Sequence, residues 1–123
     1  MIVRFLKSSM YALEGLWFAL KTERNVQIWF SIFIITYLTA FWLEVSGTEF
    51  LFVIVWTFVI GVAEYLNTAI EKLADRVSLE REEQIKRVKD VSAGATFLAS
   101  TGAFITGLII FLPKILAKFG ISF

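Results

Sequence analysis

Residues 50–75 read FLFVIVWTFVIGVAEYLNTAIEKLAD, and the architecture of the chain can be worked out from them. The first fourteen of these residues carry no charge, which is typical of a helix inside a membrane. The remainder places polar side chains at three- and four-residue spacings: Glu64, Asn67, Glu71 and Asp75. At roughly 100° per residue these side chains fall within an arc of about 80°. The stretch therefore predicts one continuous helix with a polar stripe.

The rest of the chain has the same apolar character. Of its 123 residues 58% are hydrophobic and the mean hydropathy is +0.74, which favours a lipid bilayer as its surroundings. Uncharged stretches at 26–43 and 91–112 predict two further spans beside one at 50–70. Residues 2–21 instead have the helical spacing of an amphipathic surface helix, with a soluble helix on a core as the alternative. We expect an all-α membrane protein with a single domain over residues 1–123.

Short polar segments join the predicted spans. Residues 44–49 predict a turn, and the densely charged residues 76–89 predict a loop in water. Pro113 is expected to end or weaken the last helix. The third span has small residues at fourfold spacing, which allow close approach of membrane helices: Ala95, Ala99, Ala103 and Gly107. Three spans are few for burying several polar groups within one chain, so we expect a homo-oligomer.

The distribution of Lys and Arg predicts the orientation. Four such residues precede the first span and six lie within 72–89, whereas the turn between the first two spans has none. Only two follow the third span. By the positive-inside rule, the N-terminus and the 72–89 loop are expected in the cytoplasm.

Carboxylates are the candidate chemical groups. The chain has no Cys and no His, so a metal site would use oxygen ligands, which favours magnesium. Glu64 lies about 21 Å along its helix from Phe50, inside the hydrocarbon layer, where a charge costs about 2.5–3.5 kcal/mol. A carboxylate shielded from water holds a proton more tightly, which suits a general base. Glu71 lies at the cytoplasmic boundary, where Glu23 could join it in holding magnesium.

Charged residues at the same cytoplasmic level suggest phosphoryl transfer from a nucleotide to a lipid alcohol: Arg4, Lys7, Lys89 and Asp90. The chain lacks both GxxxxGK[ST] and GxGxxG, so a nucleotide site would be of an unusual, membrane-built kind. Two alternatives remain open. One is a proton-coupled transporter with Glu64 as the carrier, and the other is a non-catalytic subunit whose polar stripe, or a protonated or paired Glu64, serves assembly. No nucleic acid partner is expected.

The motif EYLNTAIEKLADRV at 64–77, with Lys89-Asp90 opening the third span, resembles the small prokaryotic diacylglycerol kinase and undecaprenol kinase family. Other stretches that carry the resemblance are RFLKSSMYALEGL, ERN, KDVSAGA and GLIIFLPKI. The resemblance implies a homotrimer in the bacterial inner membrane, with one surface helix and three spans per chain. It also implies transfer of the γ-phosphate of ATP to a lipid alcohol, with magnesium.

By the same resemblance, Glu64 is the general base and Asn67 orients it or the lipid. The metal that accompanies ATP would be bound by Glu23 and Glu71. The nucleotide would also contact Arg4, Tyr11, Lys89 and Asp90, with Lys7 and Asp75 in support, at a site between neighbouring subunits. The Tyr-His pair that many members have near the nucleotide is replaced by Arg81-Glu82. The stretches NTAIEK, ERN and KDVSAGA look more like the branch that favours undecaprenol than the diacylglycerol branch.

Overall fold

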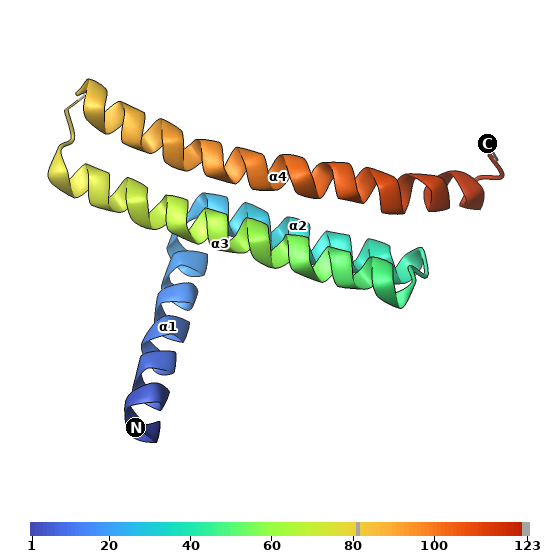
Figure 1. Cartoon of the computed structure of the whole chain (residues 1–123), viewed down its shortest axis with the longest axis horizontal. Helices are drawn as coiled ribbons and strands as arrows, with labels where there is room; N and C mark the ends of the chain where they lie inside the picture. Colours follow the sequence, from blue (N-terminus) through green and yellow to red (C-terminus); the bar gives the residue numbers. More distant parts are fainter. Residues whose placement is uncertain (81, 122–123) are drawn as a thin grey trace.

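The computed structural model describes residues 1–80 and 82–121, and four helices make up nearly all of them (Figure 1). They are α1 (Ile2–Thr22), α2 (Arg24–Trp42), α3 (Gly47–Val77) and α4 (Glu83–Lys118). No strand occurs in the described residues, so the predicted all-α class is confirmed. Of the four, α2, α3 and α4 are long and apolar enough to cross a membrane.

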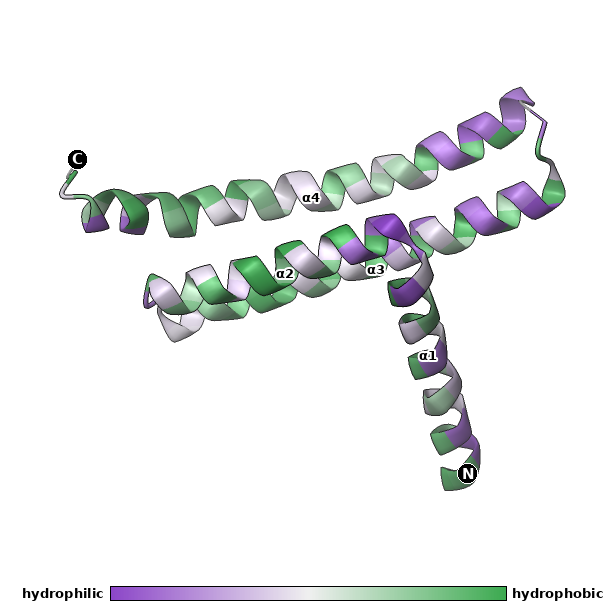
Figure 2. Ribbon diagram, turned by 180° about the vertical axis from the view of Figure 1, so that it is seen from behind, coloured by the Kyte–Doolittle hydropathy of each residue, from purple (hydrophilic) through white to green (hydrophobic). Residues whose placement is uncertain are grey.

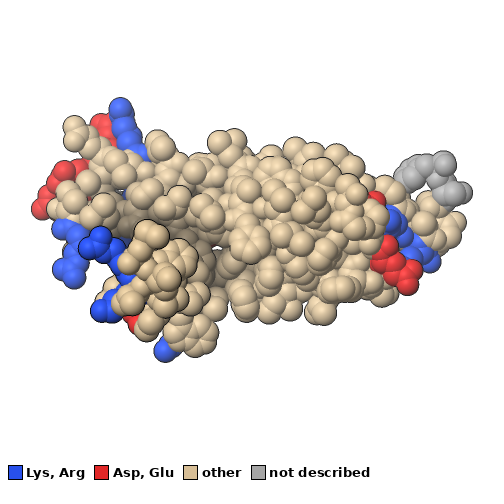
Figure 3. Space-filling model, turned by 60° about the horizontal axis from the view of Figure 1, so that its bottom comes forward, with Lys and Arg blue, Asp and Glu red and all other residues tan. Residues whose placement is uncertain are grey.

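The three long helices run alongside one another, and α1 runs across them (Figure 1). Helix α3 packs against both α4 and α2, while α1 contacts α2 and α3 near its C-terminal end. Apolar residues dominate the middle of the three long helices. Hydrophilic residues gather at the end where α3 is connected to α4, and along one side of α1 (Figure 2). Charged side chains cluster at the two ends with an uncharged belt between them (Figure 3). This distribution indicates an integral membrane protein.

The corner between α1 and α2 is a single residue. Glu23 is extended, with φ −106° and ψ 117°, while its N–H still donates to the Ala19 carbonyl at 2.8 Å. The Tyr65 hydroxyl of α3 donates to the Leu16 carbonyl of α1 at 3.0 Å. Ala19 and Val26 are buried on either side of the corner. These contacts fix the direction in which α1 leaves the other helices.

The predicted turn at 44–49 is shorter than expected, because α3 begins at Gly47. Ser46 caps that helix with a complete capping box: its hydroxyl accepts from the Glu49 N–H at 3.2 Å, and its own N–H donates to Glu49 Oε2 at 2.8 Å. Helix α2 ends in a Schellman motif in which Glu44, with φ 53°, takes the left-handed position that favours glycine. Two caps therefore replace most of the expected turn.

The predicted loop at 76–89 is wrong for most of its length. Helix α3 continues to Val77 and α4 begins at Glu83, so the connection is only residues 78–82. Arg81 lies outside the described residues. Glu, Gln, Lys and Arg are good helix formers, and Arg87 pairs with Glu83 one turn away at 2.6 Å. High charge density here indicates contact with water rather than the end of a helix.

Helix α4 does not end at Pro113 but runs on to Lys118. A proline removes only one backbone hydrogen-bond donor from a helix. Beyond Pro113, two lysines of α4 contact the neighbouring helices. Lys114 Nζ lies 3.2 Å from Glu49 Oε2 on α3. Lys118 Nζ lies 5.1 Å from the centre of the Trp42 ring on α2, a distance typical of a cation–π contact.

At two helix contacts a tryptophan ring lies directly against a glycine of the neighbouring helix. A Cβ at Gly61 would lie 2.6 Å from Cζ2 of Trp29, and one at Gly102 would lie 2.2 Å from Cη2 of Trp56. Both distances are shorter than real Cβ contacts, so a side chain at either position would require the tryptophan ring to shift. Of the small residues expected to mediate close packing on α4, Ala99 is buried, and Gly102, which was not among them, lies against the Trp56 ring.

Candidate active site

The polar stripe of α3 contains a half-buried carboxylate, Glu64, within a helix that is long and apolar enough to cross a membrane. Glu64 has one oxygen, Oε2, that is buried and has no hydrogen-bond partner among the described residues. Asn67 is only 5% exposed, and its Nδ2 donates to Glu71 Oε1 at 3.4 Å. The Asn67 oxygen, Oδ1, is also buried and unpartnered in the described chain. Glu64 Oε2 and Asn67 Oδ1 therefore belong to residues about one helical turn apart. Both oxygens are hydrogen-bond acceptors, and the carboxylate can also take up a proton.

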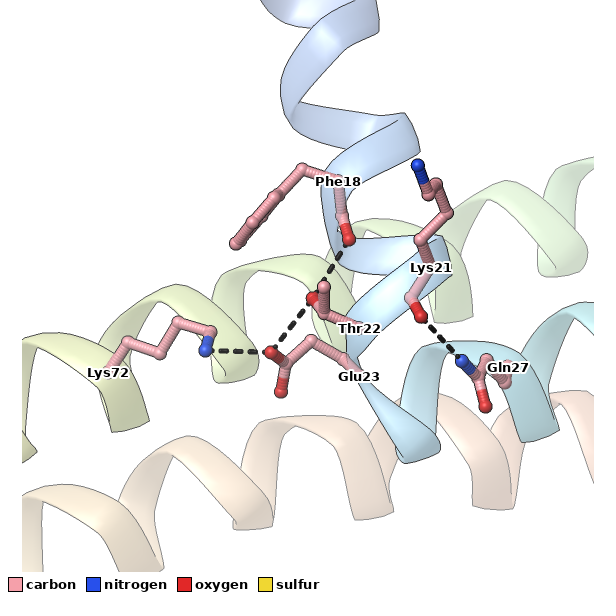
Figure 4. A network of polar contacts seen from close by, with 6 residues as sticks. All are labelled: Phe18, Lys21, Thr22, Glu23, Gln27 and Lys72. Atoms are coloured by element: carbon pink, nitrogen blue, oxygen red, sulfur yellow. Dashed lines mark hydrogen bonds and ion pairs between the residues drawn. The ribbon is translucent and has the colours of Figure 1, made fainter.

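Glu23 lies at the corner between α1 and α2 and is tied to α3 by an ion pair (Figure 4). Lys72 Nζ lies 2.7 Å from Glu23 Oε1, and the Thr22 hydroxyl donates to the same oxygen at 3.1 Å. The bond from Lys72 lowers the pKa of the Glu23 carboxyl below its ordinary value. Figure 4 draws these two contacts to Glu23 together with the bonds from Thr22 to the Phe18 carbonyl and from Gln27 to the Lys21 carbonyl. Lys72 follows Glu71 directly in the sequence, so the pair brings Glu23 to the level of Glu71 on α3.

Lys89 and Asp90, which are predicted to contact the nucleotide, each form an ion pair with another residue. Lys89 Nζ pairs with Asp75 Oδ1 on α3. Asp90 Oδ2 lies 2.7 Å from Lys86 Nζ, one turn earlier on α4. Lys89 and Asp75 therefore lie together across the α3–α4 hairpin, near the connection between the two helices.

The remaining predicted nucleotide contacts lie apart from these groups. Arg4, Lys7 and Tyr11 line a shallow groove along the N-terminal half of α1. That half of α1 points away from the long helices (Figure 1). Within one chain, the structure therefore does not bring these three side chains to Glu71 or Lys89.

The acidic residues suit a hard cation by donor type. Among the described residues, no group of three or more acidic side chains could hold an ion by itself. Magnesium in kinase sites is usually held by one or two carboxylates together with substrate phosphates and water. Glu23 and Glu71 match that pattern, since both supply oxygen donors and they lie at a similar level of the helices.

Three residues of this region were not expected from the sequence. Lys72 belongs to the basic segment 72–89 of the sequence, and in the structure it pairs with Glu23. Tyr65 ties α3 to α1 through its hydroxyl. Ser92 of α4 is 6% exposed, and its hydroxyl has no hydrogen-bond partner in the described chain. A serine within an uncharged span is the signal that could have marked Ser92.

Comparison with known proteins identifies the family. The sequence profile described as prokaryotic diacylglycerol kinase matches residues 10–111. The chain belongs to the prokaryotic diacylglycerol kinase family. The kinase is 34% identical to the undecaprenol kinase of Bacillus subtilis over 112 residues, which cover 91% of each protein. It is 34% identical to the diacylglycerol kinase of Pseudomonas aeruginosa over 89% of each. With that of Escherichia coli, identity is 29% over 87% of this chain and 88% of the other.

The kinase is thus a lipid kinase, and the expected resemblance is confirmed. The alternative of a proton-coupled transporter finds no support in these relatives. A kinase uses ATP as its co-substrate, and a lipid acceptor agrees with the membrane-spanning helices. The relatives include kinases named for two different lipids, so their names leave the acceptor open.

Proposed function

We propose that this kinase transfers the γ-phosphoryl group of ATP to the hydroxyl of undecaprenol or diacylglycerol at the cytoplasmic face of the bacterial inner membrane. The concentration of Lys and Arg in the N-terminal region and in residues 72–89 supports a cytoplasmic location for both. The C-terminus and the connection between α2 and α3 then lie on the outer side. In this orientation, the stripe on α3 runs from the hydrocarbon layer to the cytoplasm.

One observation carries the assignment of the general base. Glu64 Oε2 is buried in a spanning helix without a partner among the described residues, although a carboxylate there is costly. A lipid hydroxyl enters from the membrane and can donate to this oxygen. Glu64 would accept the proton as the hydroxyl oxygen attacks the γ-phosphorus and ADP leaves.

Asn67 would orient the acceptor or Glu64, because its amide is held by Glu71 and its oxygen faces no donor in the described chain. Glu23 and Glu71 would hold magnesium, which neutralises charge on the phosphates of ATP. Lys89 and Asp90 would contact the nucleotide, and Asp75 would hold Lys89 in place.

The nucleotide site would be completed by a second copy of the chain in a homotrimer. Arg4, Lys7 and Tyr11 lie on the part of α1 that points away from the chain's own long helices (Figure 1). A neighbouring chain could bring its α1 to Glu71 and Lys89. The many exposed apolar side chains on α2, α3 and α4 allow such packing as well as contact with lipid.

We favour undecaprenol as the acceptor. The stretches NTAIEK, ERN and KDVSAGA support this choice by their resemblance to the undecaprenol branch. Both lipids present one hydroxyl at the interface beneath a long apolar tail, so the proposed chemistry is the same for either.

The test uses purified protein in mixed micelles with labelled ATP, magnesium and either undecaprenol or diacylglycerol. Label should move to a lipid, and Glu64→Gln should reduce kcat by at least about a hundredfold while assembly is kept. Glu44→Gln is the matched control, because Glu44 is exposed at the other end of the long helices. The ratio of kcat/KM for the two lipids gives the acceptor.

Two results would contradict parts of this proposal. Absence of labelled lipid with both acceptors would remove both proposed substrates. Full activity of Glu64→Gln would keep the kinase but remove Glu64 as its base.

A further inference from the structure

A groove between α3 and α4 lies beside the polar stripe. It has a volume of about 490 Å³, and most of its wall is apolar. Its apolar lining residues are Ala63, Leu66, Ile70, Val88, Val91 and Ala95. Asn67 and Ser92 also line it, from opposite helices, and Arg87 of α4 adds a charged side chain to the lining.

Two buried polar side chains interrupt the apolar wall. Asn67 is 5% exposed and Ser92 is 6% exposed. Asn67 Oδ1 and Ser92 Oγ each lack a hydrogen-bond partner within residues 1–80 and 82–121. Buried polar atoms are normally paired, so two unpaired oxygens from residues that line one groove indicate that it takes a ligand with a hydrogen-bonding group of its own.

The chemistry of the two atoms defines that group. An amide oxygen only accepts hydrogen bonds, and the contact of Asn67 Nδ2 with Glu71 fixes which end of the amide carries the oxygen. A serine hydroxyl both donates and accepts. An alcohol hydroxyl matches this pair, since it can accept from Ser92 and donate to Asn67, and a hydrocarbon chain matches the apolar walls.

We propose that Ser92 positions the reacting hydroxyl of the acceptor lipid in this groove, together with the Asn67 amide oxygen. This inference rests on the function proposed above. Asn67 lies only about 4.5 Å along the α3 axis from Glu64. With Ser92 donating to a lone pair of the substrate oxygen, the substrate proton stays available for Glu64, whose Oε2 is also unpartnered in the described chain.

The test compares two nearly isosteric variants, Ser92→Thr and Ser92→Val, which differ only in the hydroxyl. Ser92→Val should raise KM for the acceptor lipid about fivefold or more relative to Ser92→Thr, as expected for one lost hydrogen bond. KM for ATP should be unchanged, and kcat should change by less than about twofold. Ser92→Ala, which adds no atoms, should raise KM in the same way, and Ser100→Ala, at an exposed serine of α4, should not.

A deoxy analogue of the acceptor lipid, with hydrogen in place of the hydroxyl, separates positioning from packing. Its inhibition constant should be the same for Ser92→Thr and Ser92→Val, because it has no hydroxyl for Ser92 to hold. Equal KM values for the two variants, or a parallel change in the inhibition constant of the analogue, would make Ser92 a packing residue only and overturn the inference. Failure of the wild-type enzyme to phosphorylate either lipid would instead overturn the proposed function, and this inference with it.

Discussion

Lys72 of α3 holds Glu23 at the corner between α1 and α2, with 2.7 Å between Nζ and Oε1 (Figure 4). The corner residue that interrupts the helices is therefore also anchored to the helix that carries the polar stripe. The pair ties the Glu23 carboxylate to the residue that follows Glu71 in the sequence and, with the bond from Tyr65 to the Leu16 carbonyl, fixes the start of the first span. The geometry of the proposed metal site and the direction of α1 thus depend on the same contact.

The Glu23–Lys72 pair predicts a pH-dependent contribution to stability. Lys72 lowers the pKa of the Glu23 carboxyl from its ordinary value of 4.5. The pair therefore stabilises the fold above that ordinary value, and the contribution is lost as the pH falls through the lowered pKa. Thermal unfolding in micelles should show the wild type more stable than Glu23→Gln at pH 7, by an amount that shrinks as the pH falls below that ordinary value. A difference that stays constant with pH would mean that Glu23 acts without its charge.

Gly102 should not tolerate a methyl group, because a Cβ there would lie 2.2 Å from Cη2 of Trp56. We expect Gly102→Ala to lower the free energy of unfolding by about 1–3 kcal/mol through overpacking between α3 and α4. Gly94→Ala is the matched control on the same helix, since nothing lies within 4 Å of its Cβ position. Because alanine is the better helix former, Gly94→Ala should be neutral or stabilising by up to about 1 kcal/mol. Reversible unfolding in mixed micelles, followed by circular dichroism, measures both, and equal effects would refute the packing argument.

Glu44 predicts a stabilising substitution. Its φ of 53° lies in the left-handed region, which is strained for a residue with a side chain. Glu44→Gly should raise the free energy of unfolding by up to about 1 kcal/mol, after allowance for the greater freedom of glycine in the unfolded chain. Glu44→Ala should give no such gain, because it keeps the Cβ. Denaturant or thermal unfolding of the two variants side by side checks the prediction, and a loss of stability in Glu44→Gly would contradict it.

The pair of Lys89 with Asp75 allows a test that separates support of the fold from nucleotide binding. Lys89→Met should raise KM for ATP about tenfold or more, because a charge-assisted contact is lost. The double variant Asp75→Lys/Lys89→Asp restores an ion pair of reversed direction. If Lys89 contacts the nucleotide, the double variant should recover thermal stability but not KM for ATP. Recovery of both would assign Lys89 to the pair alone.

The positions of the helices could be predicted because hydropathy and periodicity are local properties of the sequence. The stripe of Glu64, Asn67 and Glu71 follows directly from the helical repeat. The ends of the helices were harder to predict. The charge of residues 76–89 indicates that they contact water, but it does not show whether they form a loop or a helix. Helix α4 continues beyond Pro113, and Lys114 and Lys118 in that continuation contact the neighbouring helices.

The cross-helix part of the site could not be predicted from the sequence. The pairing of Glu23 with Lys72 depends on the direction in which α1 leaves the corner. The burial of Ser92 opposite Asn67 depends on which face of α4 meets α3, and the close fit of Gly102 on Trp56 takes part in that choice. Contacts of this kind arise from tertiary packing, which no single helix encodes.

Among the long helices, α3 packs between α2 and α4. In this arrangement the described chain buries few of its own side chains. Much of the free energy that holds the native state must then come from whatever covers the outer faces, whether lipid or another copy. If another copy covers them, the apparent stability follows mass action, so the unfolding midpoint should rise with the protein-to-detergent ratio. The stability of the folded state then depends on the composition of the lipid and detergent mixture around it. Dilution into detergent alone would lower that stability.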